Sequence, residues 1–307
     1  MPHRKGPTKP AGPNLTGEPP TVSGRWLVTA ASLAIVAAAA CAWITLCLLF
    51  WQGSWQLLYH PASEVSRTPA SVGLAFDPVA FATTEAGVPR LEGWWIPAAP
   101  DAPTTRYTVL YLHGQDGNLS NAVNDLAALH AIGLNILAFD YRGYGQSHFA
   151  HPSEALLRED ADWALNYLTS TRHINASSII LDGRDLGADL ALEVAAEHPE
   201  LAGVVLESPL DSPVDAIFSD PRARLVPARL LVRDRFDATL AATGLRIPSL
   251  WLVQEPTLES SAGKINDPAG YDRVASSKML VWLTNGPDLE QRRANACSRW
   301  LDDLPAR

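Results

Sequence analysis

The stretch that decides the fold is residues 177–199, which read SSIILDGRDLGADLALEVAAEHP. A short run rich in isoleucine is followed by a turn with glycines at 183 and 187, and then by apolar residues at helical spacing. A strand that passes through a tight turn into a helix is the repeating unit of α/β proteins. The stretch therefore predicts a parallel sheet with its site at the carboxyl ends of the strands.

The same alternation extends on both sides of this stretch. The predicted strands are Thr108–Leu112, Leu134–Phe139, Ser178–Leu181, Gly203–Leu206, Ser249–Val253 and Met279–Thr284. The predicted helices fall near 119–131, 153–170, 187–197, 268–276 and 288–303. Before them, residues 77–97 alternate around a Glu-Ala-Gly turn, which predicts an antiparallel hairpin. The pattern as a whole predicts an α/β fold with a mostly parallel sheet, helices on both faces and an N-terminal hairpin.

Three glycine-containing loops follow predicted strands. They read HGQDGN at 113–118, DYRGYGQSHFAHPSE at 140–154 and DGRDLG at 182–187. Because the carboxyl ends of parallel strands meet at one edge of a sheet, we expect the functional site among these loops.

Residues 26–51 carry no charge and predict a transmembrane helix. A cleavable signal peptide would have a shorter apolar region, of roughly 7–15 residues, and a buried helix is rarely apolar on all faces. We expect a disordered tail at 1–25, a connector at 52–77 and the folded domain at 78–307. Basic residues precede the span, so the N-terminus is expected in the cytoplasm and the folded domain outside, in the periplasm of a Gram-negative cell.

Charge and composition exclude several functions. The chain has 307 residues, 24 basic and 33 acidic; four basic and one acidic residue precede residue 26, which leaves a net charge of −12 on the rest. So acidic a domain repels a phosphate backbone, and nucleic acid is not an expected partner. The three cysteines form no metal or disulfide pattern, and no nucleotide or metal motif occurs, so no cofactor and no metal is expected.

The turn at 182–187 has the context of a nucleophile elbow, where an active serine hydrolase carries GxSxG. This chain has Gly183 and Gly187 in place but Asp185 where the serine would stand. The strings HGQDGN, DYRGYGQSHFAHPSE, QLLYHP and LVRDRFD also resemble segments of single-anchor α/β-hydrolases, a subgroup similar to serine aminopeptidases and depalmitoylating thioesterases. The resemblance covers residues 55–303 and implies the α/β-hydrolase fold.

The resemblance implies the roles of several residues. The backbone N–H groups of Gln115 and Leu186 match the two oxyanion donors, and His113 and Gly114 belong to the oxyanion loop. The segment that would carry the acid reads VQEPTLES at 253–260, and the one that would carry the histidine reads TNGPDLEQ at 284–291. No histidine follows His198.

A Ser–His–acid mechanism needs all three groups, so their joint loss predicts a pseudoenzyme that binds an unknown ligand or protein partner at the membrane. Two alternatives remain open. In the first, Asp185 would act as a nucleophile, as in haloalkane dehalogenases. In the second, His148 or His151 would supply a substitute base for a hydrolase of acyl esters, thioesters or peptides. A third possibility is a purely structural or interaction module at the membrane.

Overall fold

A computed structural model describes residues 23–100, 102, 104–255, 267–284, 286 and 288–304. The chain divides into two compact units, residues 1–49 and 50–307. Most of the predicted tail at 1–25 lies outside the described residues.

The described part of the first unit is most of helix α1, Gly24–Gly53. Its mean hydropathy reaches 2.5, and nearly all of its side chains are exposed. In the part of the chain that the structure describes, it is the one helix long and apolar enough to cross a membrane, a property shared by membrane anchors and signal sequences. It extends two residues beyond each end of the predicted span.

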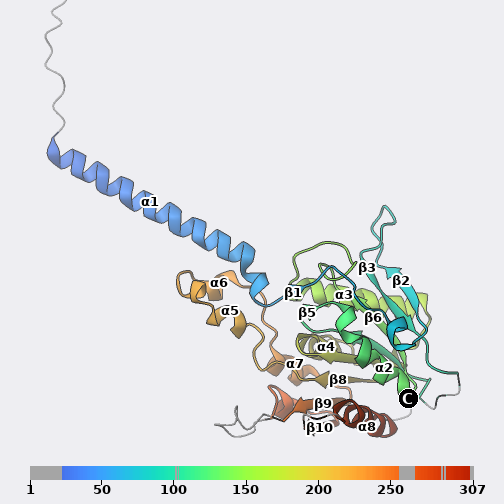
Figure 1. Cartoon of the computed structure of the whole chain (residues 1–307). Coiled ribbons are helices and arrows are strands. Elements are labelled where there is room, and N and C mark those ends of the chain that lie inside the picture. The colour runs from blue at the N-terminus through green and yellow to red at the C-terminus, as the bar shows by residue number, and fades with distance from the viewer. Residues whose placement is uncertain are drawn as a thin grey trace, which may run out of the picture. The chain divides into compact units, whose positions relative to one another are not determined.

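The second unit is built on an eight-stranded sheet with the order β10-β9-β8-β7-β4-β6-β3-β2 (Figure 1). The strands are β2 Asp77–Phe81, β3 Leu91–Ile96, β4 Thr108–Leu112, β6 Asn135–Asp140, β7 Ile179–Arg184, β8 Gly203–Glu207, β9 Ser249–Gln254 and β10 Lys278–Leu283. Neighbours pair in parallel except β2 with β3 and β3 with β6. Two further short strands, β1 His60–Pro61 and β5 Asp116–Gly117, form a separate parallel pair.

The second unit contains longer helices, which pack in two groups on the sheet, and short helices in the segment 214–244. They are α2 Val123–Ala131, α3 Glu154–Asn166, α4 Leu186–Glu197, α5 Asp215–Ser219, α6 Ala228–Leu231, α7 Ala238–Gly244 and α8 Leu289–Asp302. Helix α4 contacts α3 and α7, whereas α2 contacts α8. The central strands β4 and β8 are buried along their whole length, as expected for parallel strands covered on both faces.

The mostly parallel sheet and the hairpin β2–β3 confirm the predicted fold class. The helix predicted at 268–276 is wrong, because only Tyr271–Arg273 forms a 3₁₀ turn. Gly270 precedes this turn at φ +83°, and a Cβ there would lie 2.6 Å from the carbonyl oxygen of Ala238. The chain therefore turns tightly against α7 instead of continuing as a helix. The short helices α5, α6 and α7 were not among the predicted helices.

The turn between β7 and α4 depends on its two glycines. A Cβ on Gly183 would lie 2.1 Å from the carbonyl oxygen of Gly187, and one on Gly187 would lie 2.1 Å from that of Leu112. Both contacts are with backbone, which cannot move aside as a flexible side chain would. The glycines therefore allow α4 to start directly against β4 and β7.

We predict that Gly187→Ala destabilises the folded domain by about 1–3 kcal/mol or more, because the new methyl group overlaps backbone. Gly53→Ala is the matched control, since a Cβ there meets nothing within 4 Å. Denaturant unfolding of the detergent-solubilised chain measures both. Equal stability of the two variants would contradict the close approach of α4 to β4.

Candidate functional site

Asp185 stands at the apex of the turn between β7 and α4. Its backbone has φ 50° and ψ −123°, a conformation that residues with a side chain rarely adopt. Its N–H donates to the carbonyl oxygen of Glu207 at 2.9 Å, and its carbonyl oxygen accepts from the N–H of Ala188 at 2.9 Å. These bonds hold the strained backbone of an elbow although the residue is an aspartate.

The Asp185 carboxylate lies between a guanidinium group and the loop at 113–118, which is called the oxyanion loop after its predicted role. A Cβ on Gly114 would be 3.2 Å from its Oδ2, so glycine is what lets the loop lie against the elbow. Arg184 Nε is 3.9 Å from the same oxygen. Burial raises the pKa of Asp185 and the nearby carboxylates of Asp116 and Asp125 add to this, while Arg184 opposes it. The elbow thus presents an acid in an environment that favours its neutral form.

The side chain of Gln115 covers one of the two predicted oxyanion donors. Its Oε1 accepts a hydrogen bond from the N–H of Leu186 at 3.3 Å. Its carbonyl oxygen accepts from the Tyr144 hydroxyl at 2.9 Å and from the N–H of His60 at 3.0 Å, which anchors the loop. The sequence suggested a role only for the backbone N–H of Gln115 and gave no sign that its side chain folds over the elbow.

His113 is buried beneath the oxyanion loop. Its Nδ1 lies 2.8 Å from the carbonyl oxygen of Gly114, which can only accept, so Nδ1 carries the proton. The ring packs between Tyr141 and Tyr144, with centroids 4.3 and 5.0 Å away. Its unprotonated Nε2 is 3.6 Å from Asp140 Oδ1. Burial lowers the pKa of His113 to about 4 and raises that of Asp140 to about 7, so His113 is a neutral brace for the loop.

We predict that His113 makes the fold sensitive to acid. An unfolded histidine binds a proton below about pH 6.5 but buried His113 does so only below about pH 4, so unfolding becomes more favourable as the pH falls between these values. The free energy of unfolding should lose about 2–3 kcal/mol from this group between pH 7 and 4.5. His113→Gln should remove that part of the pH dependence, measured by denaturant unfolding at several pH values. The control is His148→Gln at an exposed position; a slope unchanged in His113→Gln would refute the assignment.

The two histidines predicted as substitute bases lie elsewhere in the loop after β6. Both are exposed. The ring of His151 stacks on Trp55 at 4.8 Å, and the backbone N–H of His148 donates to the carbonyl oxygen of Arg90. Among the described residues, the Asp185 carboxylate pairs with Arg184 and has no histidine nitrogen within 4.0 Å. A catalytic role for either histidine stays a prediction to which this geometry lends no support.

Of the two segments where the resemblance places the acid and the histidine, little can be described. Residues 256–260 lie outside the described residues. In 284–291, the described residues follow β10 and lead into α8. Arg292 of α8 donates to the carbonyl oxygen of Thr284 and pairs with Asp288.

A buried ion network lies beneath the elbow, and the sequence did not reveal it. Arg293 of α8 reaches Asp125 Oδ1 at 2.7 Å and Glu207 Oε2 at 2.5 Å. Arg184 pairs with the same Asp125, which also accepts from the Tyr111 hydroxyl at 3.1 Å. Burial disfavours the charge on Arg293, but the surrounding carboxylates outweigh this and raise its pKa. The network ties α2, β7, β8 and α8 together at the base of the site.

We predict that Arg293→Met destabilises the domain by about 3–5 kcal/mol, because it removes the buried cation that lies between the carboxylates of Asp125 and Glu207. Arg299→Met on the same helix, at an exposed position, should cost less than about 1 kcal/mol. Thermal and denaturant unfolding distinguish the two. Near-equal losses would show that the network does not support the site.

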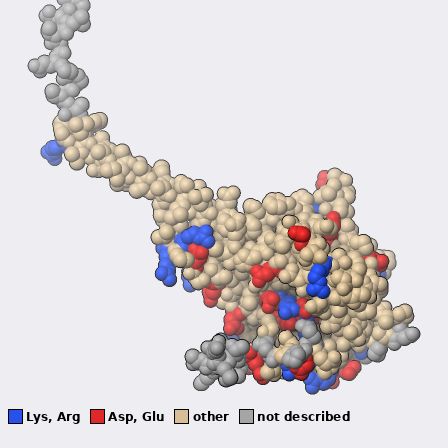
Figure 2. Space-filling model, viewed as in Figure 1, with Lys and Arg blue, Asp and Glu red and all other residues tan. Residues whose placement is uncertain are grey.

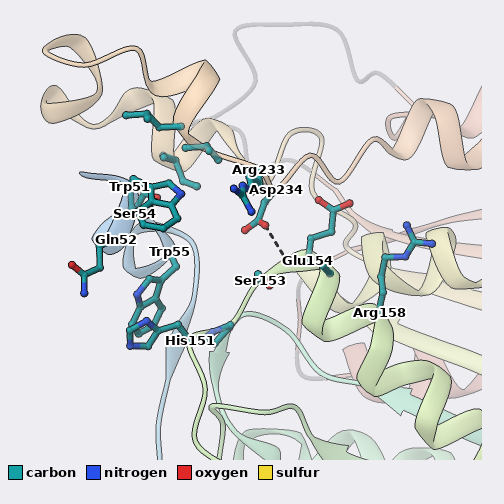
Figure 3. Close-up of a pocket in the computed structure, with 15 residues that line it drawn as sticks. Trp51, Gln52, Ser54, Trp55, His151, Ser153, Glu154, Arg158, Arg233 and Asp234 are labelled. Carbon is teal, nitrogen blue, oxygen red and sulfur yellow. Dashed lines mark hydrogen bonds between the residues drawn. The ribbon is translucent and has the colours of Figure 1, made fainter. Parts of the chain in front are cut away.

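The pocket drawn in Figure 3, of about 530 Å³, lies apart from the elbow. It is lined by residues 51, 52, 54, 55, 151–155, 158, 217 and 231–234. Figure 3 shows Asp234 turned toward the start of α3, where its Oδ1 accepts from the N–H of Glu154 at 3.2 Å. Asp185 and Gln115 do not line this pocket. Among the described residues, no group of three or more His, Cys, Asp or Glu side chains is arranged to hold a metal ion.

Residues 107–284 match the family model of the alpha/beta hydrolase fold, and the chain belongs to this family. It is 34% identical over 180 residues to an uncharacterized protein of Mycobacterium tuberculosis, covering 59% of this chain and 61% of that one. It is 36% identical over 122 residues to the mouse alpha/beta hydrolase domain-containing protein 17C, covering 39% and 38% of the two chains. The match thus spans about three fifths or less of the length of these relatives.

The solved structures that resemble this chain share its fold. An esterase of Pyrococcus furiosus superposes with a TM-score of 0.58 at 18% identity, covering 80% of this chain and 99% of the esterase. An alpha-beta hydrolase of Vibrio vulnificus superposes with a TM-score of 0.55 at 24% identity, covering 76% and 82%.

Proposed function

We propose that this chain is a membrane-anchored member of the α/β-hydrolase family that binds a ligand or protein partner without hydrolysing it. The observation that carries the proposal is the occupied elbow: Asp185 replaces the nucleophile, and the Gln115 side chain accepts the hydrogen bond of the Leu186 N–H.

The chemistry of acyl transfer fails here at two steps. Attack needs a nucleophile whose proton passes to a base in hydrogen-bond reach, and the described ion pair of Asp185 is with Arg184, a permanent cation that accepts no proton. The oxyanion that would form needs free N–H donors, and one of these is engaged with Gln115.

The competing proposal is a hydrolase that works by a variant route. The intact elbow backbone favours it, since the φ of 50° at Asp185 and the two close-packed glycines would present a reactive group if one were there. An aspartate nucleophile forms an ester that water must cleave, and this second step again requires a base. Catalysis by this route therefore depends on a histidine such as His148 or His151 approaching the elbow.

The membrane part of the proposal rests on α1. The helix is uncharged after Arg25, and basic residues precede it. Under the positive-inside rule, this arrangement favours an N-terminus in the cytoplasm and a folded domain on the outer side of the membrane. A helix retained in the mature protein would keep the folded domain at the bilayer surface.

We predict that the purified full chain hydrolyses p-nitrophenyl acyl esters no faster than buffer and takes up no fluorophosphonate at the elbow. Asp185→Ser should remain close to background, because the new hydroxyl still has no base. Turnover is measured by absorbance and labelling by intact mass.

The variants Asp185→Ala, His148→Ala and His151→Ala serve as matched controls. Turnover well above buffer that disappears in Asp185→Ala and in one histidine variant would establish the variant hydrolase instead. Turnover that survives all three would point to a contaminant or to a site elsewhere in the chain.

A further inference from the structure

Residues 214–235, called the cap arm here, expose large apolar side chains. The arm contains α5, a 3₁₀ turn at Pro221–Arg224 and α6. Leu230 is 84% exposed and Leu225 is 60% exposed. Two strongly exposed leucines on one short element are candidates for contact with an apolar phase when other features of the element agree.

The cap arm is also basic, although the domain that carries it is acidic. Five arginines fall within 14 residues, at positions 222, 224, 229, 233 and 235, and Figure 2 shows the basic side chains gathered over α5 and α6. Arg222 is paired with Asp220. Arg224 and Arg229 are exposed and, among the described residues, have no carboxylate within 4.0 Å. Their charge is therefore available to an external anion.

A groove of about 360 Å³ runs through the arm between these features. It is lined by Phe218, Ala223, Arg224, Val226, Pro227, Ala228, Arg229 and Leu230. The Arg229 guanidinium lies 4.9 Å over the ring of Phe218, which fixes one basic group at the side of an apolar floor. An apolar floor with two cations suits the phosphate and upper acyl chain of a phospholipid.

The cap arm lies next to the point where the chain leaves α1. Leu231, Val232 and Arg233 line the same pocket as Trp51, Ser54 and Trp55 (Figure 3), and α5 contacts the turn Ser54–Leu57. Tryptophans at the end of an apolar helix mark the headgroup level of a bilayer. The arm thus sits at the level that Trp51 and Trp55 would take at a membrane surface.

We propose that the cap arm docks on the surface of an anionic bilayer, the one that α1 spans. Leu225 and Leu230 enter the headgroup–acyl boundary, and Arg224 and Arg229 bind lipid phosphates from either side of the groove. This proposal rests on α1 being a retained anchor but does not require that the elbow be inactive. An anionic bilayer is favoured over a protein partner because the arm presents exposed leucines together with exposed, carboxylate-free arginines, which match the acyl boundary and the phosphates of such a surface.

The test uses the full chain in vesicles of phosphatidylglycerol and phosphatidylcholine, compared with vesicles of phosphatidylcholine alone. Cys41 and Cys47 are replaced by alanine, and Cys297 is buried and stays unlabelled. An environment-sensitive fluorophore is attached at Leu230→Cys or, as control, at Val88→Cys, which is 54% exposed at the β2–β3 hairpin. Brominated lipids should quench the label at 230 but not at 88, and more strongly in anionic vesicles.

The double variant Arg224→Gln/Arg229→Gln measures the electrostatic contribution to docking of the arm on the bilayer. It should lower the equilibrium constant for docking by about thirtyfold, the loss expected for two surface cations. The control is Arg106→Gln/Arg273→Gln, two exposed arginines outside the arm. Equal quenching at 230 and 88, or quenching at 230 unaffected by lipid charge and by the arginine variant, would overturn the proposal.

Flotation after alkaline carbonate extraction distinguishes a failure of the membrane anchor from a failure of the docking proposal. A chain that does not float shows that α1 is no anchor, which defeats the membrane part of the proposed function. A chain that floats while its label at 230 stays unquenched retains the anchor and rejects docking of the arm.

Discussion

The site depends on one steric constraint, the contact of the α4 N-terminus with the end of β4. Gly187 lies so close to the carbonyl oxygen of Leu112 that no side chain fits between them. This contact brings the elbow at Asp185 against the oxyanion loop at Gly114. All the short-range chemistry around Asp185, including the cover provided by Gln115, follows from two backbone turns being forced together.

Side-chain interactions then fix what the backbone has brought together. Below the elbow, Arg293 links two carboxylates on different elements, and behind the loop, His113 stands neutral between two tyrosine rings. The buried charges around Arg293 cost desolvation energy and add little net stability, but the loss of one partner is expensive. They act as positional restraints: they penalise any displacement of the elbow relative to α2 and α8.

The sequence predicted the backbone of this site better than its side chains. Periodicity and glycine placement sufficed for the parallel strands, the hairpin and the turn at 182–187, because these depend on local sequence. The helix predicted from the sequence at 268–276 is wrong, because the tight turn at Gly270 is set by its packing on α7. The sequence also gave no sign of the Arg293 network, since its partners Asp125 and Glu207 lie 168 and 86 positions away and have no pattern in common. The roles predicted for the elbow residues remain proposals.

The group that covers the Leu186 N–H at the elbow is a side chain and not part of the backbone. Gln115 engages the Leu186 N–H through its terminal amide, whereas the path of the backbone at this turn is set by the contacts of Gly183 and Gly187. Chemistry and architecture are therefore encoded by separate atoms in this chain. A change at position 115 can therefore cover or uncover this N–H while the glycine contacts that set the path of the backbone stay in place.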